Sequence, residues 1–284
     1  IAQLDCLGAF AHLVYAHLQK FAPKIEAYVK QQQYKKETFE LELFPKAETL
    51  KVVAKEVIAY TGNTGGSGGP HLHFEIRDKQ ERPMNPMLFG LDIKDTTKPE
   101  VYELFGYPLS EGSHINGVNS RVKIRLIKLA DGTYKTEQIT AFGKIGFGII
   151  STDRQDYASN KNGVSLIETT FNGAKSLEVD FKRFSFSETK HLNRYIDYGY
   201  FYETKKRIQK LFIDTNNPLK LLKNHQNQGI VSIEDNTNSV YKISVSDYKG
   251  NQSKLNIPII GLQKELPKAR IKTQVLQNII ASEE

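Results

Sequence analysis

The segment Gly69-Pro70-His71-Leu72-His73-Phe74-Glu75-Ile76 alternates polar and apolar side chains. Residues two apart in a β-strand point to the same side, so the segment predicts a strand with His71, His73 and Glu75 on one face. The apolar residues between them are expected to face a core. Two imidazoles on one rigid strand can form the base of a zinc site, because neutral imidazole is a common zinc ligand. Such a pair alone could equally be two surface histidines on an edge strand.

A glycine-rich run comes directly before this strand: Gly62-Asn63-Thr64-Gly65-Gly66-Ser67-Gly68-Gly69-Pro70. Glycines without side chains leave room for a substrate backbone to approach closely. The run is not a phosphate-binding loop, because no Lys-Ser/Thr pair follows the glycines and no G-x-G-x-x-G spacing opens a helix. A third histidine lies upstream in Tyr15-Ala16-His17-Leu18, which is predicted to form a strand with apolar neighbours. Taken alone, His17 could be an ordinary structural histidine.

Together, the glycine run, the His-x-His strand and the Tyr-Ala-His-Leu strand closely resemble the lysostaphin/LytM-type zinc metallopeptidases. Enzymes of that family cut the peptide cross-bridges of bacterial peptidoglycan, and the resemblance covers about residues 14–90. It implies that His73 is a zinc ligand and that His71 positions or deprotonates the attacking water. It also implies that His17 stabilises the developing oxyanion. The loop residues expected to contact substrate are Asn63, Thr64, Gly65, Ser67 and Gly69.

The sequence departs from the family pattern upstream of His17. Family members take two further zinc ligands from an H-x-x-x-D motif there, and residues 1–16 contain no such motif. Either the chain lacks an N-terminal portion or its site is degenerate, and a chain that starts at Ile1 inside the domain favours the first explanation. Asp5 and His12 are the residues that could complete the site in this chain.

Composition and length suit a globular chain of about two domains. The 284 residues are 39% hydrophobic and 25% charged, which argues against dominant disorder, and no apolar stretch is long enough to span a membrane. The net charge of +7 is diluted among predicted strands beyond residue 90, so no nucleic-acid partner is expected. The single cysteine, Cys6, cannot form an internal disulfide. An envelope location, periplasmic or extracellular, follows from the family resemblance alone.

The predicted fold is mostly β: a partial LytM-type antiparallel peptidase domain followed by an immunoglobulin-like β-sandwich. Residues 24–37 are expected to be helical, and the alternation in residues 39–44 predicts a half-buried strand. Beyond residue 100, alternating strands separated by turns such as Asp131-Gly132 favour an antiparallel sandwich. The expected division is a peptidase domain over 1–90, a linker over 91–99, a sandwich over 100–262 and a polar tail over 263–284.

The remaining candidate sites in the sequence are weaker. Asp153, Asp156, Asn160 and Asn162 could hold calcium, although Asp/Asn-rich loops are usually turns. The isolated histidines (His114, His191 and His225) are expected on the surface or in packing positions, and the aromatic residues of 195–202 are expected in the sandwich core. For the intact protein, the leading functional hypothesis is therefore a zinc endopeptidase acting on cell-wall cross-links. The one zinc site is expected to be incomplete in this chain, because two metal ligands are missing, so the chain itself is expected to be inactive. The alternatives are a non-catalytic LytM-like module that binds wall peptide or regulates another hydrolase, and an adhesion or scaffold protein that functions through its sandwich.

Overall fold

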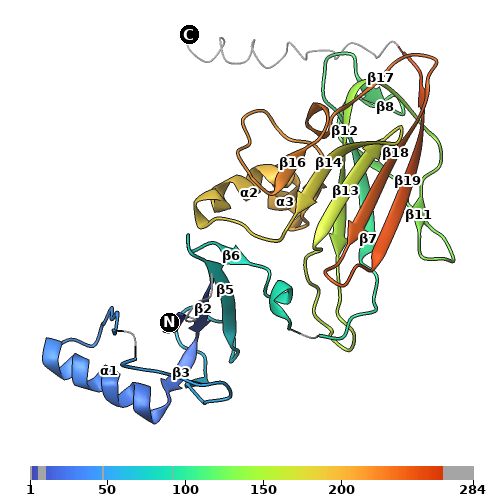
Figure 1. Ribbon diagram of the computed structural model, residues 1–284. Helices are drawn as coiled ribbons and strands as arrows, with labels where there is room; N and C mark the ends of the chain where they lie inside the picture. Colours follow the sequence, from blue (N-terminus) through green and yellow to red (C-terminus); the bar gives the residue numbers. More distant parts are fainter. Residues whose placement is uncertain (1, 6–10, 47, 92, 265–284) are drawn as a thin grey trace, which may run out of the picture. The chain divides into compact units, whose positions relative to one another are not determined.

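The computed structural model describes residues 2–5, 11–46, 48–91 and 93–264, and the chain is mostly β, as predicted. Cys6 and most of the predicted polar tail (265–284) lie outside the described residues. The chain divides into two compact units (Figure 1). Unit 1 comprises Ile1–Leu91 with Arg183–Phe186, and unit 2 comprises Asp92–Lys182 with Ser187–Glu284. None of the helices in the described ranges is long and apolar enough to cross a membrane.

Unit 1 is built on a small antiparallel sheet in the order β1-β2-β5-β6, beside a separate pair of strands, β3 and β4. Strand β2 pairs along its whole length with β5, which sets Ala16 opposite His73. Only a few apolar side chains of this unit are fully buried, among them Val14 and Ile76. The elements are β1 (Ala2–Asp5), β2 (Ala11–Ala16), β3 (Leu18–Phe21), α1 (Pro23–Lys36), β4 (Ala59–Thr61), β5 (His73–Asp78), β6 (Pro83–Met84) and the 3-10 turn η1 (Pro86–Phe89).

Helix α1 confirms the helix expected over 24–37. Pro23 occupies its first turn, and Glu37 ends it in the left-handed conformation at φ 51°. The strand expected over residues 39–44 is wrong: Phe39 and Phe44 are 92% and 87% exposed, and the residues form no strand. Alternation predicts a strand only where a neighbouring strand covers one face, and none in the described chain pairs with this segment. Leu72, expected to face a core, is also 46% exposed, because it lies in the loop ahead of β5.

Asp78, at the end of β5, binds the residues that follow it in unit 1. Its Oδ2 accepts hydrogen bonds from the Arg82 Nε at 2.8 Å and from Arg183 Nη1 at 3.1 Å, while Oδ1 accepts from the backbone N–H groups of Gln80 and Arg82. Burial alone would raise the pKa of Asp78, but the hydrogen bonds from Arg82 and Gln80 lower it to about 2. Asp78 therefore ties the segment Arg183–Phe186 to the rest of unit 1.

Unit 2 is a single curled sheet whose main path runs β16-β14-β13-β18-β19-β12-β7-β9. Its strands are β7 (Glu100–Pro108), β8 (His114–Ile115), β9 (Val122–Ile124), β10 (Ile127–Lys128), β11 (Tyr134–Lys135), β12 (Ile139–Thr152), β13 (Leu166–Phe171), β14 (Ala174–Asp180), β15 (Gln209–Lys210), β16 (Leu222–Asn224), β17 (Val231–Ile233), β18 (Asn238–Ser246) and β19 (Gln252–Gly261). Its helical segments are α2 (Thr189–Tyr195), α3 (Tyr198–Thr204) and η3 (Asn227–Gly229), and the 3-10 turn η2 (Phe186–Glu188) begins at the last residue of the unit 1 segment.

The long strand β12 makes this sheet continuous. Its first residues pair in parallel with β19, and the residues from Ile145 onward pair antiparallel with β7. Gly143, at φ +74°, lies where the pairing changes, and a Cβ there would come within 3.0 Å of Ser113. Hydrogen bonding thus runs unbroken through β12 and the strands curl around the core (Figure 1). Two separate sheets packed face to face would define an immunoglobulin-like sandwich, and this strand order does not confirm that arrangement.

The core of unit 2 is formed by alternating inward residues of the long strands. Phe147 of β12 and Tyr241 of β18 are both fully buried, with ring centroids 4.6 Å apart. The large side chains around them are mostly branched aliphatic residues from β7, β12, β13 and β18. Tyr195 is buried as expected for the aromatic residues of 195–202, whereas Tyr198 and Tyr202 are exposed. His114 is a packing residue with no exposed surface.

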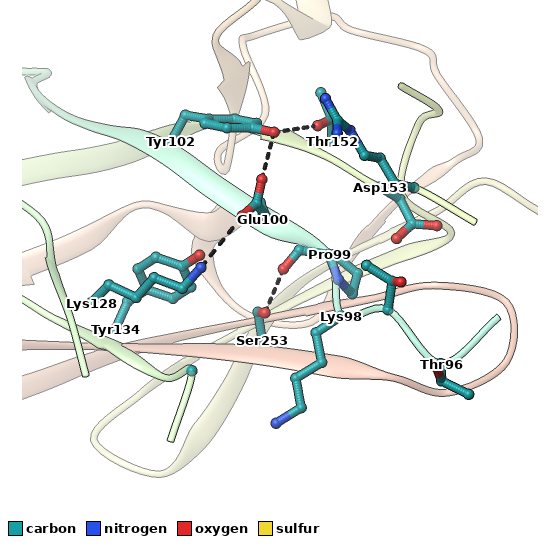
Figure 2. A pocket seen from close by; sticks show the side chains of 13 residues that line it. Thr96, Lys98, Pro99, Glu100, Tyr102, Lys128, Tyr134, Thr152, Asp153 and Ser253 are labelled. Carbon is teal, nitrogen blue, oxygen red and sulfur yellow. Dashed lines mark hydrogen bonds and ion pairs between the residues drawn. The ribbon is translucent and has the colours of Figure 1, made fainter. Parts of the chain in front are cut away.

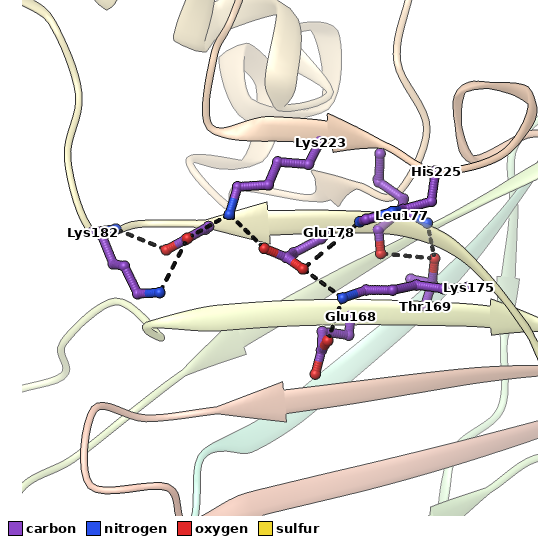
Figure 3. A network of polar contacts seen from close by, with 9 residues as sticks. Glu168, Thr169, Lys175, Leu177, Glu178, Lys182, Lys223 and His225 are labelled. Atoms are coloured by element: carbon purple, nitrogen blue, oxygen red, sulfur yellow. Dashed lines mark hydrogen bonds and ion pairs between the residues drawn. The ribbon is translucent and has the colours of Figure 1, made fainter.

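Alternating charges stabilise the outer face of β13, β14 and β16 (Figure 3). Glu178 lies between two lysines, with Lys175 Nζ 2.5 Å from its Oε2 and Lys223 Nζ 2.6 Å from its Oε1. Hydrogen bonds from these two lysines lower the pKa of Glu178 to about 2. Lys175 also contacts Glu168, and Lys223 also contacts Asp180. Each charge on this face of the three strands therefore has an opposite charge beside it.

Replacing Phe147 with Ala should strongly destabilise unit 2. The change leaves a cavity beside Tyr241, and truncating a buried Phe costs about 3–5 kcal/mol. We expect the free energy of unfolding, measured by urea denaturation, to fall by that amount. Tyr157→Ala is the control, since Tyr157 is 94% exposed, and its effect should stay within about 0.5 kcal/mol. Equal losses in both variants would contradict the assignment of Phe147 to the core.

Asp78→Asn should destabilise unit 1 at neutral pH but not in strong acid. Because the folded pKa of Asp78 lies below its usual value of 3.8, its contribution is present above about pH 4 and disappears as the pH falls towards 2. The loss at pH 7 should be about 1–2 kcal/mol. The loss of stability relative to the original chain is measured at pH 7 and again near pH 2, by hydrogen exchange of the β5 amides. Glu40→Gln, which removes an exposed carboxylate, is the control. A loss that is the same at both pH values would show that Asp78 acts through shape rather than charge.

Candidate metal centre

Three histidines from separate segments of unit 1 lie together. Each of His17, His71 and His73 offers one ring nitrogen, and these nitrogens all lie within 4.8 Å of one another. The His17 ring centroid is 4.8 Å from that of His71 and 5.6 Å from that of His73. His71 is exposed, while His17 and His73 are half-buried, so solvent and a ligand can reach the group. We call these three residues the histidine cluster.

The backbone of each segment aims its histidine at the cluster. His73 is the first residue of β5 and pairs with Ala16 of β2. His17 directly follows Ala16, so it lies next to His73. His17 itself adopts φ 55°, a left-handed conformation that breaks the chain between β2 and β3 and turns its ring towards β5. His71 pairs across an isolated bridge with Gly62, through a hydrogen bond from the His71 N–H to the Gly62 carbonyl oxygen at 3.1 Å.

Carbonyl groups of the glycine loop set the tautomers of two of these rings. Nδ1 of His17 donates to the carbonyl oxygen of Thr64 at 2.7 Å, and Nδ1 of His71 donates to the carbonyl oxygen of Gly69 at 2.8 Å. The Ser67 hydroxyl lies 3.2 Å from the same nitrogen of His71 and donates to the Gly69 carbonyl. A carbonyl can only accept, so in each neutral ring the lone pair is on Nε2. Nε2 is thus the atom available to a metal or a proton.

His73 is oriented by a carboxylate instead. Its Nε2 lies 2.5 Å from Oε1 of Glu75, and Oε2 of Glu75 accepts a 2.7 Å hydrogen bond from Arg77 Nε. Burial opposes ionisation of Glu75, but the hydrogen bonds from Arg77 and His73 hold its pKa below the ordinary value. An ionised Glu75 fixes Nε2 of His73 as the protonated nitrogen, which leaves Nδ1 with the lone pair. A carboxylate behind the remote nitrogen of a histidine is the usual support for a metal-ligating imidazole.

The donor set of the cluster fits zinc. Imidazole nitrogens are of the type that zinc takes from a protein, and three of them lie within 4.8 Å of one another. No carboxylate of the described side chains joins this group. His12 does not reach it and lies 3.9 Å from Glu81 instead, and the side chain of Asp5 is not among those described.

Four of the five loop residues predicted to contact substrate lie against the histidines in this structure. Thr64, Ser67 and Gly69 supply the hydrogen-bonding groups described above, and Gly65 lies beside His17, with its Cβ position 3.9 Å from Nδ1. Asn63 is exposed. These backbone carbonyls carry no signal in the sequence, because any residue has a carbonyl and only the loop conformation aims it.

Comparison with known proteins agrees with the motif. Residues 41–86 match the family model of Peptidase family M23, and the matched range contains the glycine run together with His71 and His73. The match confirms the resemblance and supports a LytM-type peptidase family member. No curated protein and no solved structure matches the chain. The M23 match makes the histidine cluster a candidate metallopeptidase centre.

Gly62→Ala should disturb the histidine cluster from outside it. A Cβ at Gly62 would lie 2.5 Å from the backbone nitrogen of Gln19, so the strand that carries the His71 contact must move. We expect a loss of about 1–3 kcal/mol in unfolding free energy and weaker zinc retention, measured by chemical denaturation and elemental mass spectrometry. Gly66→Ala is the matched control, since nothing lies within 4 Å of its Cβ position. Unchanged stability and zinc retention in Gly62→Ala would contradict this close packing.

Proposed function

We propose that the chain carries part of the centre of a zinc metalloendopeptidase that cleaves peptide cross-links of bacterial peptidoglycan in the cell envelope, on the periplasmic or extracellular side. The observation that carries the proposal is the histidine cluster beside a glycine loop, within and next to the segment that matches the M23 family model. Imidazole nitrogens with defined lone pairs, reachable from solvent, are the groups that peptide hydrolysis by an activated water requires.

Within the cluster we assign His73 as the zinc ligand, with Glu75 and Arg77 holding its ring in place. Bound zinc would lower the pKa of a water molecule and polarise the scissile carbonyl. His71 takes a proton from the attacking water through Nε2, because its Nδ1 proton is held by the Gly69 carbonyl. Its exposed position lets it reach both water and substrate.

His17 requires a second proton for the role proposed for it. Its Nδ1 proton is directed to the Thr64 carbonyl, so a neutral His17 offers only a lone pair on Nε2. Donation to a developing oxyanion therefore needs the imidazolium form, in which both nitrogens carry protons. The neighbouring His71, with its ring centroid 4.8 Å away, can exchange a proton with it through water.

The glycine loop favours an extended peptide as substrate. Gly66, Gly68 and Gly69 have open space where a Cβ would be, and most of the loop is exposed. A peptide backbone can approach such a loop closely and hydrogen-bond to its free backbone groups. Asn63, Thr64, Gly65, Ser67 and Gly69 are the loop residues proposed to line this approach.

A second candidate function rests on the composition of the cluster. Family members add a His and an Asp ligand from an H-x-x-x-D motif, and no carboxylate of the described side chains joins the three imidazoles as a further ligand, because Glu75 binds only the remote nitrogen of His73. A cluster limited to three imidazoles could serve a non-catalytic LytM-like module that binds wall peptide or regulates a separate hydrolase. Such a module would sediment with purified peptidoglycan without releasing soluble peptides.

The enzyme proposal predicts both zinc binding and cleavage. If a further group completes the site around His73, the chain should retain about one zinc ion after dialysis against a mild chelator, and His73→Ala should lose most of it. On purified peptidoglycan, His71→Ala should release soluble peptides about 100- to 10,000-fold more slowly while retaining the metal. Elemental mass spectrometry and chromatography of the released peptides are the measurements.

His191→Ala is the control for these variants, since His191 lies in unit 2 outside the cluster, and it should change neither quantity. Cleavage that persists in both His71→Ala and His73→Ala would overturn the assignment. Retained zinc with wall binding but no peptide release would favour the non-catalytic module.

A further inference from the structure

Unit 2 contains a second group of metal-ligand side chains, which the peptidase proposal does not use. Asp95, Asp153 and Asp247 each bring one carboxylate oxygen to within 4.8 Å of the others. Asp95 enters from the segment before β7, Asp153 directly follows β12, and Asp247 directly follows β18. Three segments far apart in the sequence thus converge on one point, and we call these residues the aspartate cluster.

Asp153 and Asp247 are buried, each with 6% of its surface exposed, and Asp95 is half-buried. Three carboxylates at this spacing repel one another, and burial removes the water that would screen them. Burial, together with the charges of Asp247 and Asp95, raises the pKa of Asp153 to about 6. The repulsion needs either a shared proton or a cation to offset it.

The environment of Asp153 indicates a ligand independently of the distances between the three carboxylates. Its Oδ1 has no exposed surface and no hydrogen-bond partner among the described residues, although nine-tenths of the residue is buried. Buried carboxylate oxygens are nearly always paired, because an unpaired one loses the hydration of a full charge. Asp153 is one of the residues that line an open pocket of about 380 Å³, and in Figure 2 no dashed line reaches its carboxylate. A cation at this point would give the oxygen the partner that it lacks.

The other two carboxylates are already held in position. Asp247 accepts hydrogen bonds from the backbone N–H and the side-chain amide of Asn251, at 2.9 Å and 2.6 Å. The same amide donates to the Asp95 carbonyl oxygen at 3.1 Å, and Asp95 Oδ1 accepts from the Thr97 N–H at 3.1 Å. Each of these oxygens keeps a further lone pair for a cation. The positive charge of Lys249 favours the ionised form of Asp95. No hydrogen bond from the described residues reaches the buried Oδ1 of Asp153.

We propose that the aspartate cluster binds one calcium ion through Asp95, Asp153 and Asp247. The donor set consists of oxygens alone, which hard cations prefer and zinc does not require. Mutual separations of up to 4.8 Å are compatible with one ion at Ca–O distances of about 2.3–2.6 Å. Water ligands would complete the six- to eightfold coordination that calcium takes.

Calcium at this point would join the segment that enters unit 2 to two turns of its sheet. Of the loop residues that the sequence suggested for calcium, only Asp153 belongs to the cluster. Asp156 instead accepts hydrogen bonds from Thr96 and Thr97, which places the entering segment beside the same loop. The function of the ion would therefore be to order residues 93–99 against the sheet.

Calcium titration of the full chain, freed of metal by a chelator, tests the proposal by calorimetry. We expect one site per chain and a rise in unfolding midpoint of about 5 °C or more when calcium exceeds Kd about 100-fold. Hydrogen exchange of residues 93–99 should slow on addition of calcium. Asp153→Asn should weaken binding at least about tenfold.

Asp153→Asn has a second expected effect that separates lost binding from misfolding. Without calcium, this variant should unfold at a higher temperature than the original chain, because one of three repelling charges is gone. Glu137→Gln, which removes an exposed carboxylate of the same unit, should leave calcium binding unchanged. His73→Ala should also bind calcium normally, so loss of the zinc centre and loss of this site can be told apart.

Three outcomes would overturn the proposal. The first is no calcium binding at millimolar concentration with a midpoint that rises as the pH is lowered towards 5, which indicates a shared proton instead. The second is equal loss of binding in Glu137→Gln, which indicates non-specific attraction. The third is binding of magnesium in preference to calcium, which indicates a different, octahedral site.

Discussion

The antiparallel register of β2 and β5 is the constraint on which the candidate centre depends. Because Ala16 lies opposite His73, the next residue along β2 is brought beside the His-x-His segment. The left-handed backbone at His17 then turns its ring inward. A shift of one residue in this register would move His73 to the other face of the sheet and separate the three imidazoles. The positions of the three imidazoles in unit 1 therefore depend on the pairing of β2 with β5 rather than on a large hydrophobic core.

The two units differ in how they are stabilised. Unit 2 has an extensive core centred on Phe147 and Tyr241, and its outer face carries alternating charges that neutralise one another. Unit 1 buries few apolar side chains and relies on hydrogen-bonded groups such as Asp78 with Arg82 and Arg183. An exposed glycine loop is compatible with such a unit, because the loop is held by hydrogen bonds and its backbone stays accessible, as the proposed binding of a peptide would require.

Both metal-ligand clusters follow the same physical rule with different donors. In the histidine cluster, carbonyl and carboxylate groups hold the ring protons, so that lone pairs point inward. In the aspartate cluster, Asn251 and Thr97 hold two carboxylates while a third keeps an unpaired, buried oxygen. Imidazole nitrogens suit zinc and carboxylate oxygens suit calcium, so each site would select its own ion.

The sequence by itself determined the mostly β composition, helix α1, the strand that carries His73 and the likeness to peptidase family M23, because these depend on local pattern and residue spacing. It misjudged residues 39–44, since alternation cannot reveal whether a partner strand exists. Only the tertiary structure decided the continuous curl of unit 2, the tautomers of His17 and His71, and the meeting of Asp95, Asp153 and Asp247. Those features arise from contacts between residues far apart in the chain, and a sequence read residue by residue does not record which distant segments come together.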